Sequence, residues 1–239
     1  DSGLARVKRY SYRNKVEQLQ IEKIAQASAN QRAGRCGRVA AGVCIRLYQE
    51  QDFALRPAFA DPEIMRSSLA GVILRMKALR LGNIEDFPFI EAPPRKAISD
   101  GYQLLLELGA VSAEHALTAT GQELAKMPLD PRLARMIVAA RDEGCLREVL
   151  VIAAALSVQD PRERPQERQG AADAAHRKFA DERSEFLSWL RLWDWYQAEF
   201  EHRKSQRKLV EACHDHFLSA LRMREWREVH GQLQAVAAE

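Results

Sequence analysis

Apolar and β-prone residues gather in two runs within the first 24 positions, and these runs predict two short β-strands. The runs 7–12 and 16–21 are rich in β-prone residues and flank the turn-like Arg13-Asn14-Lys15. We expect them to form a β-hairpin over residues 5–24. A short helix over residues 28–39 and an alternating strand over residues 42–48 are expected to follow.

From residue 61 the periodicity becomes helical. Asp61-Pro62 has the form of a helix start and Gly82 that of a helix end. Between them a single apolar stripe steps by four and three residues through Met65, Leu69, Val72, Met76 and Leu79. A second helix over residues 94–108 and a small hairpin over residues 110–118 complete the outline of a winged helix.

The second half of the chain reads as helices throughout. Asp130-Pro131 begins one helix and Gly144 ends it. Residues 145–158 are almost all apolar, which predicts a buried helix. The proline-flanked run 160–165 then interrupts the pattern. The aromatic stripe Trp189, Trp193, Tyr196 and Phe200 is expected to be core, not a stacking platform.

Composition narrows the class of protein. The 239 residues are 46% hydrophobic and 29% charged, which excludes a disordered or fibrous chain. The longest strongly apolar run, 149–156, is too short to span a bilayer. Four cysteines without a Cys-x-x-Cys pair predict a reducing compartment and no zinc site. Because the chain begins at Asp1 without a methionine or an apolar leader, we expect part of a longer protein without a signal peptide.

Positive charge is concentrated near the start of the chain. Residues 1–48 contain ten lysines and arginines but only three acidic residues, and 27 of the 36 basic residues in the whole chain are arginine. Arginine presents a planar, always-charged fork that suits phosphate groups. The segment therefore indicates a phosphate-bearing partner, although a solvated basic face would give the same count.

The most specific motif is Gln31-Arg-Ala-Gly-Arg-Cys-Gly-Arg38. On a helix, Gln31, Arg35 and Arg38 fall on one face, and Arg32 points about 100° away. Two glycines in so short a helix each cost about 1 kcal/mol relative to alanine, and close approach of another surface would explain them. Such a stripe suits a docked polyphosphate; the alternative is an arginine-rich helix with surface salt bridges.

The predicted hairpin combines cations with aromatic residues near its tip. This combination suits phosphate contacts and base stacking, so we take the hairpin as a candidate nucleic-acid surface. The alternative is a charged, solvent-facing hairpin. The candidate residues are Lys8, Arg9, Tyr10, Tyr12, Arg13 and Lys15.

The stretch Ala27-Ser-Ala-Asn-Gln-Arg-Ala-Gly-Arg-Cys-Gly-Arg38 resembles motif VI of the DEAH-box RNA helicases. Four later stretches fit the same family in collinear order, and the last of them, with His176-Arg-Lys-Phe179, most resembles its bacterial HrpA branch. They are Asp61-Pro-Glu-Ile-Met-Arg-Ser-Ser-Leu69, Phe87-Pro-Phe-Ile-Glu-Ala-Pro93, Met127-Pro-Leu-Asp-Pro131 and Asp160-Pro-Arg-Glu-Arg-Pro165.

The resemblance implies a mainly α fold in three pieces. Residues 1–49 would be the C-terminal part of a second RecA-like domain, an α/β segment with its hairpin and motif VI. Residues 50–118 would be a winged helix acting as a structural hub, and residues 119–239 a helical ratchet (HA2) bundle. The protein would be bacterial, cytoplasmic and, since no heptad pattern is evident, monomeric.

The resemblance also assigns roles to residues. Arg35 and Arg38 would be catalytic arginine fingers that, with Gln31, bind the ATP γ-phosphate, and Arg32 would be structural or a link to RNA-binding elements. The hairpin would meet the RNA strand and help part duplexes. Arg162 and Arg164, in a loop of the ratchet domain, are further candidates for RNA contact, although interleaved glutamates also fit a solvated loop.

The whole protein implied by the resemblance is an ATP-dependent 3′-to-5′ RNA helicase. It would use ATP and Mg²⁺ and act on single-stranded or partly duplex RNA, or on RNA in a ribonucleoprotein, with no membrane. The sequence contains neither a Gly-x-x-x-x-Gly-Lys-Ser/Thr loop nor an Asp-Glu-Ala-His box. We therefore expect these 239 residues to be inactive alone and to hold no metal. The rival hypothesis is a non-catalytic winged-helix adaptor that binds nucleic acid.

Overall fold

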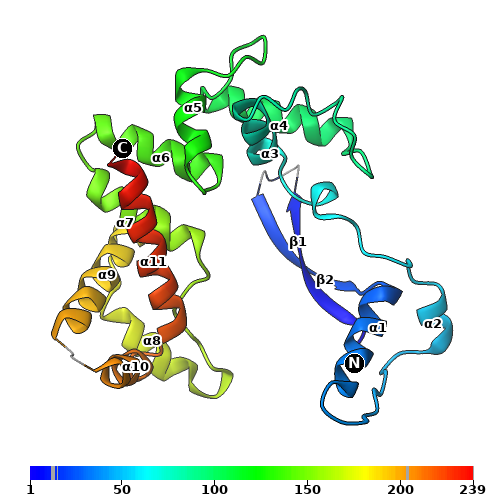
Figure 1. Cartoon of the computed structure of the whole chain (residues 1–239). Helices are drawn as coiled ribbons and strands as arrows, with labels where there is room; N and C mark the ends of the chain where they lie inside the picture. Colours follow the sequence, from blue (N-terminus) through cyan, green and yellow to red (C-terminus); the bar gives the residue numbers. More distant parts are fainter. Residues whose placement is uncertain (12–13, 15, 203–204, 239) are drawn as a thin grey trace. The chain divides into compact units, whose positions relative to one another are not determined.

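The structure is a computed structural model that describes residues 1–11, 14, 16–202 and 205–238. It divides into two compact units, Asp1–Glu107 and Leu108–Glu239. Figure 1 shows the predicted composition, mostly helices with one β-hairpin, and the expected fold class is confirmed. The division falls within residues 50–118, so the proposed three-domain boundaries remain a prediction.

The first unit begins with two antiparallel strands and continues with short helices. Its strands pair in a register that runs from Leu4 opposite Lys23 to Ser11 opposite Val16, which confirms the predicted hairpin. The elements in chain order are β1 (Leu4–Ser11), β2 (Val16–Lys23), α1 (Gln26–Gly34), the 3₁₀ turn η1 (Arg35–Gly37), α2 (Glu50–Ala54), the 3₁₀ turn η2 (Glu63–Met65), α3 (Ala70–Ala78) and α4 (Arg95–Glu107).

A buried arginine holds the base of the hairpin. Arg56 donates to the carbonyls of Gly3 (2.9 Å) and Ile24 (3.3 Å), pairs with Asp52 (2.6 Å) and lies over the ring of Tyr48. Gly3 has a φ of +69°, and a Cβ there would lie 2.6 Å from the Tyr48 ring. One cation thus satisfies backbone carbonyls from both strand ends.

Helices α3 and α4 form the apolar core of this unit. Ile73 and Leu74 of α3 are buried, as are Ile98 and Leu105 of α4. The helices approach closely at Gly101, where an added Cβ would lie 2.8 Å from Ile73 Cδ1. The apolar face of α4 is therefore occupied by packing within the protein.

The predicted strand over residues 42–48 is wrong. This segment has no strand geometry, and Val43, Ile45 and Leu47 are exposed. Within the described residues it finds only Asp1 as a backbone partner: the N-terminal ammonium donates to Ile45 O (2.6 Å) and Leu47 N donates to Asp1 O (2.9 Å). A strand needs a neighbour along its length to satisfy its backbone groups.

The predicted helix beginning at Asp61-Pro62 is also wrong in its first part. Residues 63–65 form a single 3₁₀ turn, and the α-helix begins only at Ala70. Asp61 caps no helix, because its carboxylate accepts from Arg9 Nη2 instead (2.8 Å). A long-range ion pair has replaced the local cap.

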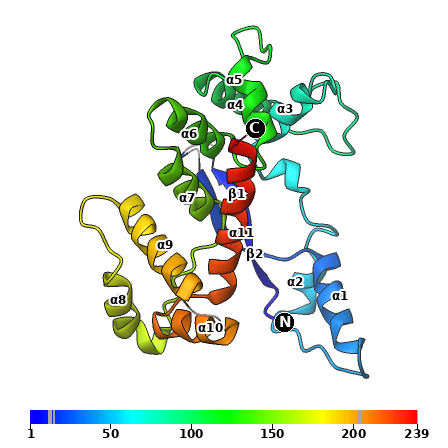
Figure 2. The same ribbon diagram turned by 60° about the vertical axis from the view of Figure 1, so that its left-hand side comes forward.

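The second unit is a helical assembly in which α7, α9 and α11 lie side by side (Figures 1 and 2). Its elements are α5 (Ala119–Lys126), α6 (Pro131–Asp142), α7 (Leu146–Ser157), the 3₁₀ turn η3 (Gln166–Arg168), α8 (Gln169–Arg177), α9 (Glu185–His202), α10 (Gln206–Asp215) and α11 (Ala220–Ala237). The small hairpin expected at residues 110–118 is reduced to one bridge, between Val111 and Leu117.

Tryptophans fill the centre of this unit. Trp226 is fully buried, and its indole N–H donates to Val151 O at 3.0 Å. The rings of Trp189 and Trp193 pack against it with centroids 5.6 and 5.0 Å away. The predicted core stripe on α9 is confirmed as far as Tyr196, whereas Phe200 is partly exposed beneath Arg227.

The predicted start and end of α6 are confirmed. Asp130 caps α6 by accepting from Arg132 N (2.9 Å), Pro131 occupies its first turn, and Gly144 follows its end with a φ of +67°. The four cysteines of the chain form no disulfide in this structure.

Candidate functional site

The segment Gln31–Arg38 leaves α-helical geometry partway along. Helix α1 ends at Gly34 and a 3₁₀ turn covers Arg35–Gly37, so the predicted helix over residues 28–39 is shorter and tighter than expected. Glycine's low helix propensity explains the change. Residues three apart eclipse one another in a 3₁₀ helix, so Arg35 and Arg38 still lie on one side, with Gln31 one turn earlier.

Gln31, Arg35 and Arg38 project into solvent. All three are exposed, and the described part of the chain supplies no hydrogen bond or ion pair to any of their side chains. An added Cβ at Gly34 or Gly37 would meet nothing within 4 Å. The absence of side chains there is therefore not required by packing within the described chain. The segment offers two guanidinium forks and an amide to a ligand or surface from outside.

Arg32, in the same helix, has the opposite environment. Its Nη1 donates to Asp1 Oδ1 (2.9 Å) and its Nη2 to Leu4 O at the start of β1 (3.1 Å). The Asp1 carboxylate is almost fully buried. Arg32 thus ties α1 to the hairpin, in line with the structural role expected for it.

The hairpin cations fall on two faces. Lys8 and Tyr10 alternate with Arg9, so they lie on the opposite side of β1. Lys8 pairs with Glu17 across the strands (2.7 Å). Arg13 and Lys15, with Tyr12, lie outside the described residues. Arg6, which sequence reasoning did not select, is exposed and lies on the face of Lys8 and Tyr10; its two-residue spacing from Lys8 was the available signal.

Arg9 is held between two carboxylates. Its Nε donates to Glu22 Oε1, and its Nη2 donates to Glu22 Oε2 (2.9 Å) and Asp61 Oδ2 (2.8 Å). Hydrogen bonds to Glu22 and then Asp61 raise the pKa of Arg9, and the same contact with Arg9 lowers the pKa of Glu22. This cation is already neutralised within the unit.

The loop after residue 159 also uses its arginines internally. Arg162 bonds Asp160 and Glu185, both at 2.8 Å, and lies over the Trp189 ring. Although burial opposes its charge, these carboxylates raise the pKa of Arg162.

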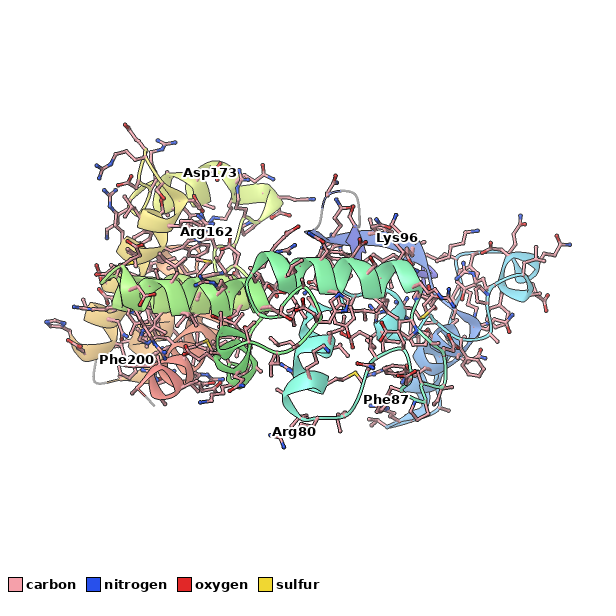
Figure 3. All side chains as sticks on the ribbon, turned by 90° about the horizontal axis from the view of Figure 1, so that it is seen from above. Arg80, Phe87, Lys96, Arg162, Asp173 and Phe200 are labelled. Atoms are coloured by element: carbon pink, nitrogen blue, oxygen red, sulfur yellow. The ribbon has the colours of Figure 1, made fainter. Side chains whose placement is uncertain are left out.

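A second arginine of this loop pairs with the neighbouring helix. Arg164 bonds Asp173 of α8 at 2.8 Å. Figure 3 labels Arg162 and Asp173 in this region. Their geometry fits a structural role for Arg162 and Arg164, and RNA contact by these residues stays a prediction.

Among the described residues no group of three or more histidine, cysteine, aspartate or glutamate side chains could hold a metal ion. No described helix is both long and apolar enough to cross a membrane.

The helical second unit indicates the class of protein. Residues 130–217 match the family described as helicase associated domain (HA2), ratchet-like. The chain is also 51% identical over its whole length to the ATP-dependent RNA helicase HrpA of Escherichia coli K12, and 52% identical to its Haemophilus influenzae homolog. A human relative, "Probable ATP-dependent RNA helicase DHX35", is 37% identical over 92% of the chain.

These matches confirm the resemblance inferred from the sequence. Over its whole length the chain is similar to one segment of the HrpA-type RNA helicases, and it contains a helicase-associated HA2 domain. It spans 19% of the length of the two bacterial relatives and 30% of the human one.

Proposed function

We propose that this chain forms part of the core of an ATP-dependent RNA helicase that moves 3′ to 5′ along RNA. Gln31, Arg35 and Arg38 face the γ-phosphate of ATP held mainly by residues outside these 239. The two guanidinium groups stabilise the charge that develops on the transferring phosphoryl group, and Gln31 positions that group or the attacking water.

One observation carries the proposal. Within one short segment, residues 32–38, Arg32 has two partners inside the chain, whereas Arg35 and Arg38 have none among the described residues. Two exposed like charges three residues apart repel each other weakly in water, and a bound anion would offset that repulsion. The open space beside Gly34 and Gly37 lets a phosphate group or a second protein surface approach closely. Mg²⁺ would supply further positive charge to the phosphate groups in the parent, and residues outside these 239 would hold it.

The hairpin supplies the RNA side of the proposal. Arg6, Lys8 and Tyr10 share one face of β1 and offer cations beside an aromatic ring, which suits a strand of stacked bases. Arg162 and Arg164 would line the RNA path in the ratchet domain. Closure of the nucleotide site around Arg35 and Arg38 would then alternate with advance of the strand past the hairpin.

The test is ATP hydrolysis by the full-length parent with and without single-stranded RNA, beside its Arg35→Ala variant. Removing an arginine finger lowers turnover by about 10³-fold or more, and RNA affinity should stay within about two-fold. Arg207→Ala is the matched control, because Arg207 is an exposed arginine that pairs, among the described residues, with Glu211 on α10.

Two outcomes would contradict the proposal. RNA-stimulated hydrolysis at a near-normal rate in Arg35→Ala would remove the finger assignment. No hydrolysis by the parent, with RNA still bound, would favour the non-catalytic adaptor.

A further inference from the structure

Residues 56–66 connect the two functional elements of the first unit; we call this segment the strap. It follows α2 and leads through η2 toward α3, and its contacts join the start of α1 to the edge of β1. Helix α1 carries Gln31 and precedes Arg35, and β1 belongs to the hairpin.

At one end the strap caps α1. Helix α1 has no side-chain cap, and its first backbone N–H groups need acceptors. The strap provides them: Gln26 N donates to Pro57 O (2.9 Å) and Ala27 N to Ala58 O (3.0 Å). The Gln26 side chain also donates to Arg56 O at 2.8 Å. Two consecutive residues of α1 thus bond to three consecutive residues of the strap.

At the other end the strap pairs with the free edge of β1. Tyr10 N donates to Arg66 O at 2.7 Å, and Arg66 Nη1 donates to Lys8 O at 3.3 Å. Between these contacts Arg9 reaches across to Asp61 while gripping Glu22 on β2. One guanidinium therefore joins β1, β2 and the strap.

Apolar packing contributes little to this contact. A cavity of about 290 Å³ lies between hairpin and strap, lined by residues that include Val7, Phe59 and Ala60. Phe59, the one large apolar side chain of the strap's middle, is mostly exposed. Whereas Arg56 and Arg32 hold the base of the hairpin, the polar contacts of Arg9 and Arg66 hold its far half against the strap.

We propose that Arg9 is a positioning residue that fixes the hairpin to the strap, and through it to α1, and that it does not contact RNA. The consequence for unwinding rests on the proposed function. We call the contact of Arg9 with Asp61 the joint. With the joint intact, movement of α1 at the nucleotide site carries the hairpin with it. With the joint broken, ATP is still hydrolysed but fewer base pairs are opened for each ATP.

Asp61→Asn in the full-length parent separates this role from RNA contact. Asp61 is exposed and negatively charged, so its loss removes no RNA contact and frees Arg9 on one side. A partly exposed ion pair is worth about 1 kcal/mol, which corresponds to about five-fold. We expect base pairs opened per ATP to fall about three- to five-fold, with RNA-stimulated hydrolysis and RNA affinity unchanged. Asp61→Glu should restore coupling, and Glu211→Gln on α10 should have no effect.

A second readout does not depend on helicase activity. Amide hydrogen exchange at Tyr10, whose N–H is bonded to Arg66 O, should speed up about five-fold in Asp61→Asn and not in Glu211→Gln. Arg9→Gln should give at least the same increase. This result would support the joint even if the parent failed to hydrolyse ATP, which would count against the proposed function alone. Unchanged exchange at Tyr10, or tighter RNA binding by Asp61→Asn at unchanged coupling, would overturn the inference.

Discussion

The two units differ in how completely they bury their large apolar side chains. In the second unit, α7, α9 and α11 enclose Trp226 completely, and Trp189 and Trp193 pack around it. In the first unit, the stretch from the end of α1 into the strap leaves a series of large apolar side chains in solvent. They are Val39, Val43, Ile45, Leu47, Leu55 and Phe59.

The difference separates a region that completes its own core from one that presents groups outward. Exposed apolar runs of this kind mark surfaces that contact something else. The same stretch of the first unit begins with Arg35 and Arg38, which are also unsatisfied within the described chain. In the second unit even loop arginines such as Arg162 are paired. Catalytic contacts are therefore expected from the first unit and stability from the second.

The largest effect should come from the centre of the second unit. Trp226→Ala removes a fully buried indole and its hydrogen bond to Val151, and should lower the free energy of unfolding by about 3–5 kcal/mol. Trp226→Phe keeps most of the volume and should cost less than half of that. Urea denaturation followed by fluorescence measures both. A cost below about 1 kcal/mol for the alanine variant would mean that this unit is not organised around Trp226.

Next comes the buried cation of the first unit. Arg56→Met leaves the carbonyls of Gly3 and Ile24 without their donor and should cost about 2–4 kcal/mol. Its neighbour Leu55 is exposed, so Leu55→Ala is the matched control and should be neutral within about 0.5 kcal/mol. Hydrogen exchange of the β1 and β2 amides would show whether the loss is local to the hairpin. Equal effects of Arg56→Met and Leu55→Ala would contradict the role of Arg56 in holding the base of the hairpin.

A smaller, pH-dependent effect is expected at His230, whose ring packs at a tilt of 47° against Trp193 with centroids 4.6 Å apart. Burial lowers the pKa of His230 below its ordinary value of about 6.5. The unfolded chain then binds the proton more readily, so this residue's stability contribution is present above pH 6.5 and declines as the pH falls below it. His230→Phe should flatten the fall in melting temperature between pH 7.5 and 5.5. The exposed His202, changed to Gln, should leave the fall intact; an identical profile for both variants would refute this assignment.

The smallest effect is expected where the first unit is most exposed. Ile45→Ala removes a side chain that contacts solvent, so thermal unfolding of these 239 residues should change by less than about 0.5 kcal/mol. Ile73→Ala, at the buried face of α3, should cost about 2–4 kcal/mol. If Ile45→Ala were equally destabilising, the stretch would be part of a core and the comparison between the units would fail.

Local signals predicted much of this fold. The cap and proline of α6, the left-handed glycines after α4 and α6, and the β-prone runs of the hairpin all act within a few residues. The sequence-based predictions failed where a partner far away along the chain determines the local structure. Asp61 pairs with Arg9, 52 positions away, instead of capping a helix, and residues 42–48 lack a neighbouring strand among the described residues.

The candidate site was predictable where its geometry depends on residues close together in the sequence. The shared side of Gln31, Arg35 and Arg38 follows from their spacing, and the structure keeps it although the α-helix ends at Gly34. The pairing of Arg9 and Arg162 with acids from other elements could not be read from the sequence, because interleaved charges fit both free and paired arginines.

The central claim is that Arg35 acts on phosphate whereas Arg32 holds the fold. The most direct test compares RNA-stimulated ATP hydrolysis by Arg35→Lys and Arg32→Lys in the full-length parent. Lysine keeps the charge but loses the planar fork. We predict that Arg35→Lys loses about 100-fold or more of turnover at unchanged melting temperature, and that Arg32→Lys keeps turnover within about three-fold but melts earlier. Near-normal hydrolysis by Arg35→Lys, or an equal loss in both variants, would contradict the account.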